Sequence, residues 1–114
     1  MRVLLTGASG YLGQHVLARL RERGLDVVLL GRSRPLGERD LPWLPVDLLD
    51  DHDLASALGE ARASHLLHLA WYAECGRYWD SPLNLRWVDA SLRLLQAFTE
   101  QGGRHAVITG TCAE

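Results

Sequence analysis

The chain has 114 residues, of which 47% are hydrophobic and 23% charged, as expected of one globular domain with a real core. The formal net charge of -2 gives no electrostatic reason to expect nucleic acid or an anionic membrane as a partner. No apolar run approaches the roughly 20 residues that span a bilayer, and the first residues lack the layout of a signal peptide. Cys75 and Cys112 have neither CxxC nor metal-ligand spacing, so we expect free thiols in a reducing cytoplasm and no metal site.

Apolar runs and helical spacing predict strands that alternate with helices. In chain order we expect a strand at residues 3–5, a helix at 11–23, a strand at 25–30, a loop at 31–40, a strand at 41–46, a helix at 48–61, a strand at 66–70, a helix at 82–101 and a strand at 106–109. Gly24 and Gly102 follow two of the helices as stop signals. Ser81 before Pro82 is typical of an N-cap followed by proline at the first helical position.

Two of these helices carry apolar residues at helical spacing, and we expect both apolar faces to pack on a sheet. The residues are Leu12, Val16, Leu17 and Leu20 in the first helix, and Leu85, Val88, Leu92 and Leu95 in the last. The second face is also consistent with a helix that pairs between two subunits, so a homodimer through this helix stays open.

Alternating strands and helices imply right-handed βαβ units and a parallel sheet. We therefore predict an α/β fold, a Rossmann-type doubly wound sheet of about five strands in the order 3-2-1-4-5. Residues 1–114 would form one nucleotide-binding domain. Pro42 and Pro45 indicate that the third strand lies at an edge of the sheet, because proline has no amide hydrogen to donate to a neighbouring strand. The last strand would lie uncovered at the other edge, which predicts that more chain follows.

A glycine-rich segment, TGASGYLG at residues 6–13, joins the first strand to the first helix. The first glycine permits a tight turn, the second lets the backbone approach a pyrophosphate, and the third lets the helix pack closely on the sheet. The amides that open the helix then point at the phosphates, aided by the helix dipole. The cofactor-binding candidates in this segment are Gly7, Ser9, Gly10, Tyr11, Leu12 and Gly13.

The end of the second strand indicates which dinucleotide binds. An acidic residue there would bind the ribose 2′-hydroxyl of NAD, whereas an arginine would neutralise the 2′-phosphate of NADP. The acidic position is filled by Gly31, and Arg32 and Arg34 follow. We therefore predict NADP as the cofactor, with NAD as the alternative. The alternative is that both arginines are solvated loop charges, and equal affinity for NADH and NADPH would count against the phosphate role.

The GxxGxxG spacing after a threonine resembles the extended branch of the short-chain dehydrogenase/reductase superfamily. Further segments resemble that family in order: Val46-Asp47-Leu48 after the third strand, HLLHLA at residues 65–70, WVDASLRLLQAF at residues 87–98 and ITGTC at residues 108–112. The resemblance implies that Asp47 and Leu48 contact the adenine, with Leu69 and Ala70 beside the cofactor. Asp47 is also suited to capping the next helix.

The resemblance also implies an active site that this sequence does not complete. Hydride transfer at a carbonyl needs an acid/base group on the oxygen, which in the family is a tyrosine followed four residues later by lysine. The sequence contains no lysine. Thr111 is the one candidate catalytic residue that the resemblance transfers to this chain, where its hydroxyl would assist the reacting oxygen. A threonine whose hydroxyl only binds backbone at a strand end is the alternative.

The resembled family suggests a substrate class. Its closest members are sugar-nucleotide epimerases, dehydratases and ketoreductases, and the dehydratases carry Asp-Glu where Cys112 and Ala113 stand here. We therefore expect the nucleotide-binding part of a nucleotide-sugar epimerase or ketoreductase, inactive alone. The alternative is a regulatory module that binds NADP and senses its redox state without chemistry. Trp87 stands where the family often has a cofactor-contacting asparagine, and Asn84 lies one turn earlier.

Other chemistry-bearing residues gather near the fourth strand. His68 is a candidate acid/base, but a lone histidine on a buried strand is more often a hydrogen-bonded core residue. The aromatic residues Trp71, Tyr72, Tyr78 and Trp79 follow this strand and suit either ligand stacking or a covered surface. Cys75 has no base beside it in the sequence, so we do not expect it to act as a nucleophile.

Overall fold

The computed structural model describes residues 1–32, 34, 37, 40–50, 54–71 and 82–110. Its elements run β1 (Arg2–Thr6), α1 (Tyr11–Glu22), β2 (Asp26–Gly31), β3 (Trp43–Pro45), α2 (Leu54–Ala61), β4 (His65–His68), α3 (Leu83–Glu100) and β5 (His105–Ile108). The strands form one sheet in the order β3-β2-β1-β4-β5, and every pairing is parallel. The predicted fold class and strand order are confirmed.

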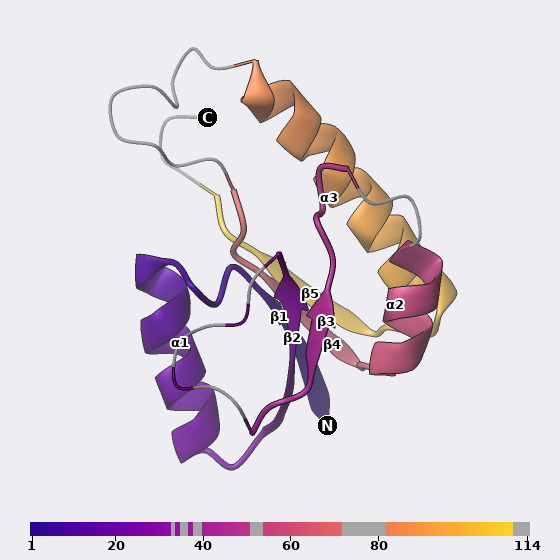
Figure 1. The fold of residues 1–114 in the computed structure, drawn as a ribbon. Coiled ribbons are helices and arrows are strands. Elements are labelled where there is room, and N and C mark those ends of the chain that lie inside the picture. Colours follow the sequence, from indigo (N-terminus) through magenta and orange to yellow (C-terminus); the bar gives the residue numbers. More distant parts are fainter. Residues whose placement is uncertain (33, 35–36, 38–39, 51–53, 72–81, 111–114) are drawn as a thin grey trace.

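The sheet lies between two helical layers, with α1 on one face and α2 and α3 on the other (Figure 1). Alternate residues of the central strands serve the two faces, as the two-residue repeat of a strand requires. Leu4 packs in the cluster under α2 and α3, whereas its neighbour Leu5 packs in the cluster under α1. Both side chains are fully buried, so β1 is apolar on both faces and forms the centre of the domain.

Two helix ends match the predicted glycine stops. Gly24 after α1 and Gly102 after α3 both have positive φ, at 68° and 101°. At the end of α1 the amides of Gly24 and Leu25 donate to Arg21 O and Leu20 O, the pair of bonds that closes a Schellman motif. These ends return the chain to the sheet after α1 and after α3.

The outer face of α3 differs from the prediction. Leu85 and Leu92 are 76% and 62% exposed, and Val88 is exposed too, so of that set only Leu95 packs against the core. The buried face carries Ala90, Ser91, Leu94, Ala97 and Phe98 instead. The helix is apolar on two sides, and the side whose Ser91 contacts His68 of β4 lies against the sheet.

Three smaller expectations also need correction. Helix α2 begins at Leu54 rather than 48, because residues 47–50 form a turn in which Asp50 N donates to Asp47 O. Pro82 takes the N-cap position of α3 rather than the first helical position, while Ser81 lies outside the described residues. Leu12 is exposed rather than packed on the sheet.

Strand β5 is an exposed edge, as the strand order predicts. All four of its residues are exposed, and Val107 is 60% accessible.

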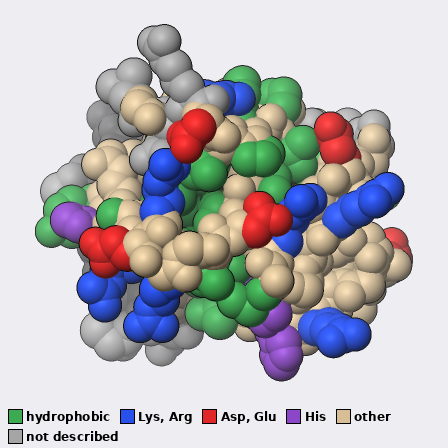
Figure 2. All heavy atoms as spheres, turned by 90° about the horizontal axis from the view of Figure 1, so that it is seen from below, with side chains coloured by type: hydrophobic (Ala, Val, Ile, Leu, Met, Phe, Trp, Pro, Cys, Tyr) green, Lys and Arg blue, Asp and Glu red, His purple; other side chains and the backbone are tan. Residues whose placement is uncertain are grey.

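Seen from the end where the N-terminus lies, basic and acidic side chains of the described residues are interspersed among hydrophobic ones (Figure 2). Among the described residues there is no helix long and apolar enough to cross a membrane, and no cluster of three or more potential metal ligands.

Candidate functional site

A cavity of about 460 Å³ opens where β1, β2 and β4 end at their carboxyl edge. Ligands of doubly wound sheets bind at this edge, where the strand order reverses, and the volume lies in the range typical of small-molecule sites. The cavity is lined by the glycine segment between β1 and α1, the ends of β2 and β4, the turn after β3, and Trp87 of α3.

The glycine segment is held by close backbone approaches. Gly7 has φ of 76°, and a Cβ built on it would lie 2.7 Å from Ala70 N. A Cβ on Gly13 would lie 1.9 Å from Gly7 O. Both glycines are therefore required by the fold itself, the first for the turn and the second for helix packing. Gly10 differs, because a Cβ there would meet only Gly7 O at 3.5 Å, an ordinary contact.

The start of α1 presents backbone donors to the cavity. Gly10 is the N-cap residue and supplies no side-chain cap, and no acidic residue stands in the first turn. The first helical bond of this end runs from Gln14 N to Gly10 O, which leaves the amides of Tyr11, Leu12 and Gly13 without intrahelical acceptors. These residues line the cavity. Unpaired amides at the positive end of a helix dipole form an anion-binding arrangement.

The end of β2 contributes Gly31 and Arg32 to the same cavity. Arg32 is exposed, and among the described residues it has no ion-pair partner. Trp43 of β3 donates from Nε1 to Gly31 O at 3.1 Å, and the guanidinium carbon of Arg34 lies 5.5 Å from the Trp43 ring centroid. An indole edge therefore fixes the backbone of Gly31, and a second guanidinium stacks beside the cavity.

Asp47 lines the cavity and also begins the turn after β3. Its Oδ1 accepts from Leu49 N at 3.1 Å within this turn, and α2 begins only at Leu54, so the expectation that Asp47 caps that helix is wrong. The turn contact and adenine binding are compatible, because an ionised carboxylate accepts several hydrogen bonds. This turn places both Asp47 and Leu48 in the wall of the cavity.

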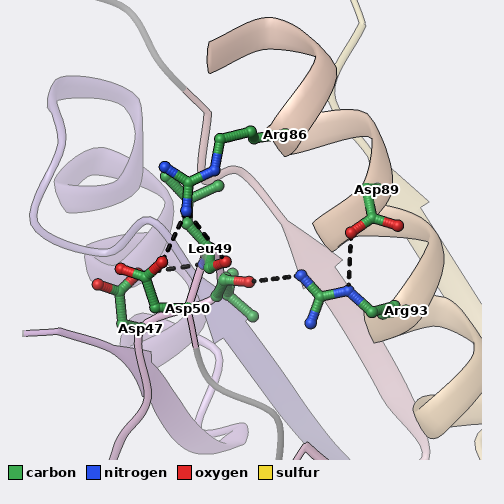
Figure 3. A network of polar contacts seen from close by, with 7 residues as sticks. Asp47, Leu49, Asp50, Arg86, Asp89 and Arg93 are labelled. Atoms are coloured by element: carbon green, nitrogen blue, oxygen red, sulfur yellow. Dashed lines mark hydrogen bonds and ion pairs between the residues drawn. The ribbon is translucent and has the colours of Figure 1, made fainter.

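Two arginines of α3 hold this turn from the other side (Figure 3). Arg86 contacts Asp50 Oδ1 at 2.6 Å and donates to Leu49 O at 3.4 Å. Arg93 donates to Leu48 O at 3.4 Å and pairs with Asp89 on its own helix at 3.0 Å. The ion pairs are exposed and each contributes about 0–1 kcal/mol, so the main effect of the two arginines is to orient the turn through Asp50 and the carbonyl groups of Leu48 and Leu49.

His68, near the end of β4, is a buried core residue, as the commoner interpretation predicts. Its Nδ1 lies 2.6 Å from Thr6 Oγ1 and its Nε2 lies 2.8 Å from Ser91 Oγ. Burial lowers the pKa of His68 to about 4, so the imidazole is neutral near pH 7. His68 is absent from the cavity wall, whereas the next two residues, Leu69 and Ala70, belong to it.

Trp43 is the one aromatic residue of the described cavity lining that has no functional counterpart among the sequence-based expectations, which name Tyr11, Trp71 and Trp87. The sequence predicts Trp43 only as part of an edge strand, yet Trp43 lines the cavity. Two other tryptophans of the lining, Trp71 and Trp87, stack with ring centroids 6.1 Å apart. Trp71 Nε1 donates to Asn84 Oδ1 at 2.9 Å, so Asn84 orients an aromatic ring in this structure. The parallel register of Leu29 with Trp43, which places the indole beside Gly31, is a tertiary property with no local signal.

The structure brings every cofactor-binding candidate to one cavity. Its lining includes Gly7, Ser9, Gly10, Tyr11, Leu12, Gly13, Arg32, Asp47, Leu48, Leu69 and Ala70. Their role in binding a cofactor stays a prediction. Thr111, the catalytic candidate, lies outside the described residues, as do Tyr72, Cys75, Tyr78 and Trp79.

The parallel sheet, the glycine segment and the cavity at the strand ends define a Rossmann-type domain. Residues 3–114 match the NAD dependent epimerase/dehydratase family, and the chain belongs to this family.

Similar proteins and solved structures support this assignment. UDP-glucose 4-epimerase of Erwinia amylovora is 32% identical over 94 residues, which are 73% of this chain and 28% of that enzyme. The structure of MoeE5 in complex with UDP-glucose and NAD is 32% identical with a TM-score of 0.81, over 98% of this chain and 37% of that one. UDP-glucose 4-epimerase of Thermus thermophilus, in complex with NAD, is 32% identical with a TM-score of 0.78 over 93% of this chain and 36% of its own. The chain therefore spans about a third of the length of these relatives.

Proposed function

We propose that this chain binds NADP(H) as the nucleotide-binding part of a nucleotide-sugar epimerase or ketoreductase. The observation that carries the proposal is the convergence of three features on one cavity: the unpaired amides that open α1, the glycine turn, and Arg32 at the end of β2. MoeE5, whose solved complex contains UDP-glucose and NAD, supports both the cofactor class and the substrate class.

The residues present fit a dinucleotide. Gly7 and Gly13 form a backbone cradle that side chains would fill, and the amides at the start of α1 suit a diphosphate. Trp43 and the Asp47 turn flank the adjoining part of the cavity, where an adenosine would lie. When bound, a nicotinamide dinucleotide supplies a hydride donor or acceptor. The chain's own residues bind and orient it.

The NADP preference depends on Arg32. Replacing Arg32 with alanine is expected to weaken NADPH binding about ten-fold, because a charge-assisted contact to the 2′-phosphate is lost, and to leave NADH binding within about two-fold. Isothermal titration of both dinucleotides measures this. Arg23→Ala is the matched control, since it removes the same charge from the exposed end of α1. Equal dissociation constants of the wild type for NADH and NADPH would contradict the preference.

We expect this 114-residue chain to bind the dinucleotide without catalysing turnover, because its sequence has no lysine to complete the family's Tyr-Lys pair. Thr111 would assist the reacting oxygen only beside such a pair. Steady oxidation or reduction of dinucleotide by the purified chain, or conversion of a UDP-sugar to its epimer without net change of the dinucleotide, would overturn this part of the proposal.

We also propose that two copies associate through the outer face of α3. Leu85, Val88 and Leu92 are exposed at spacings that place them along one side of the helix, where a second copy would bury them. Sedimentation equilibrium is expected to show a dimer that Leu92→Glu converts to a monomer. Val107→Glu is the control, because Val107 is similarly exposed on β5. A wild type that stays monomeric over the accessible concentrations would remove the dimer.

A further inference from the structure

Thr6, the last residue of β1, is a fully buried hydrogen-bonding centre. Its Oγ1 accepts from Leu69 N at 3.1 Å and from Ala70 N at 3.2 Å, and lies 2.6 Å from His68 Nδ1. The two amides belong to the residues that carry the chain from β4 into the cavity wall. One hydroxyl therefore holds the backbone at the end of the neighbouring strand.

The number of donors and acceptors fixes the direction of this network. A hydroxyl has one hydrogen to donate and two acceptor positions, and both acceptor positions of Thr6 are used by amides. Its hydrogen must then go to His68 Nδ1. A neutral imidazole with an accepting Nδ1 carries its proton on Nε2, which donates to Ser91 Oγ at 2.8 Å.

Ser91 extends the network to α3. It lies on the buried face of the helix, near its middle, and is 9% exposed. No buried side-chain polar atom among the described residues lacks a hydrogen-bond partner, so every polar side-chain atom of the network from Ser91 to Thr6 is satisfied. A satisfied polar network in an apolar core specifies one arrangement of the groups that it joins.

The held backbone lies directly against the glycine turn. A Cβ on Gly7 would come within 2.7 Å of Ala70 N and 2.8 Å of Leu69 C, so the two segments are in close contact. Any shift of Leu69 and Ala70 toward the cavity therefore displaces the turn, or fills the space that the turn leaves open.

We propose that Thr6, His68 and Ser91 form a one-directional hydrogen-bond chain that positions the Leu69–Ala70 backbone, and through it the glycine turn, for dinucleotide binding. The proposal rests on the proposed function of the cavity. His68 and Ser91 are positioning residues: neither lines the cavity, and both act through Thr6. Helix α3 thereby influences the phosphate site from the opposite side of β4.

Variants at Thr6 and Ser91, the two ends of this hydrogen-bond network, test its positioning role. In Thr6→Val the Ala70 amide loses its acceptor and the Leu69 amide keeps only the backbone oxygen of residue 6, 3.3 Å away, so we expect the dissociation constant for NADPH to rise about ten-fold or more. Thr6→Ser retains the hydroxyl and is expected to bind within about three-fold of the wild type. Ser91→Ala removes the acceptor from His68 Nε2, and we expect a smaller loss of about three-fold. Circular dichroism and urea unfolding establish that each variant is folded.

A spectroscopic measurement tests the direction of donation without any cofactor. Nitrogen-15 NMR of the imidazole is expected to show Nε2 protonated and Nδ1 unprotonated in His68 at pH 7. Protonation of Nδ1 instead would contradict the proposed direction of these hydrogen bonds, whatever the cavity binds. If the wild type binds NADPH and folded Thr6→Val binds it equally well, the positioning role is wrong. If the wild type binds neither NADPH nor NADH, the proposed function itself fails.

Discussion

Replacing Gly13 with alanine is expected to lower the free energy of unfolding by about 3 kcal/mol, the upper end of the usual cost of overpacking. A Cβ at this position would lie 1.9 Å from Gly7 O and 2.8 Å from Ala8 Cα. These are backbone atoms of a tight turn, so they cannot rotate aside as a flexible side chain would. Helix α1 must therefore move off the sheet, and the loss is a large fraction of the roughly 5–15 kcal/mol that stabilises a typical domain.

Gly10→Ala is the matched comparison for this prediction. The nearest atom to its added Cβ lies at 3.5 Å and Gly10 has φ of -79°, so we expect a stability change within about 0.5 kcal/mol. Gly10 lines the cavity, however, and the added methyl should weaken NADPH binding about ten-fold. Urea unfolding and isothermal titration separate the two effects. Equal unfolding midpoints for Gly13→Ala and the wild type would contradict the close packing of α1.

Acidification is expected to destabilise the domain through His68. The pKa of His68 is about 4 in the folded chain against 6.5 for the reference side chain, because burial disfavours the imidazolium. Between these values the unfolded state binds more protons than the folded state, so stability falls as the pH falls. The contribution is fully present above pH 6.5, and about 3 kcal/mol of it is lost by pH 4.

His68→Gln isolates this contribution, since glutamine offers an acceptor and a donor but does not titrate in this range. The variant is expected to be less stable at pH 7, yet to lose about 3 kcal/mol less than the wild type between pH 7 and pH 4. Urea unfolding at half-unit steps of pH measures both slopes. Parallel slopes would show that His68 is not held neutral by burial.

The charged groups on the elements around His68 have partners elsewhere. Arg2 of β1 pairs with Asp26, and on α3 Arg86 and Arg93 pair with Asp50 and Asp89. His65 of β4 lies 2.7 Å from Ser64 Oγ through its Nδ1 and stacks on His105 of β5. Burial is the cause of the pKa shift, so a change in ionic strength should leave the pH slope of the wild type nearly unaltered.

Much of the fold could be predicted from the sequence because its signals are local. Each strand is a short apolar run, Gly24 and Gly102 end helices through positive φ, and the alternation of elements leaves few arrangements for a parallel sheet. The glycine segment indicates the place of the cavity for the same reason. Its spacing reflects contacts within a single strand-turn-helix unit.

The failures concern properties that depend on distant parts of the chain. Helix α3 is apolar on two sides, and periodicity alone favours the larger residues Leu85 and Leu92 for the core. The sheet instead receives the side that carries Ser91, Leu94 and Phe98, where Ser91 contacts His68 of β4, a distant residue that helical periodicity does not reveal. The late start of α2 has a local cause instead, the turn at residues 47–50.

The cavity shows the same division. Residues of the glycine segment and strand ends could be placed from motif spacing, but Trp43 reaches the site only through the register of β3 on β2. The turn at Asp47 is likewise oriented by Arg86 and Arg93, which lie far along the sequence on α3. Contacts of this range carry no signal in a local pattern.

We propose that the amides opening α1 bind the diphosphate of a nicotinamide dinucleotide. Titrating isotope-labelled wild-type chain with NADP⁺ and following its amide NMR signals tests this directly. We expect saturable shifts that are largest at the amides of Tyr11, Leu12 and Gly13, as each gains a charged acceptor. Unchanged signals at these three amides under saturating dinucleotide would contradict the claim, even if shifts appeared elsewhere.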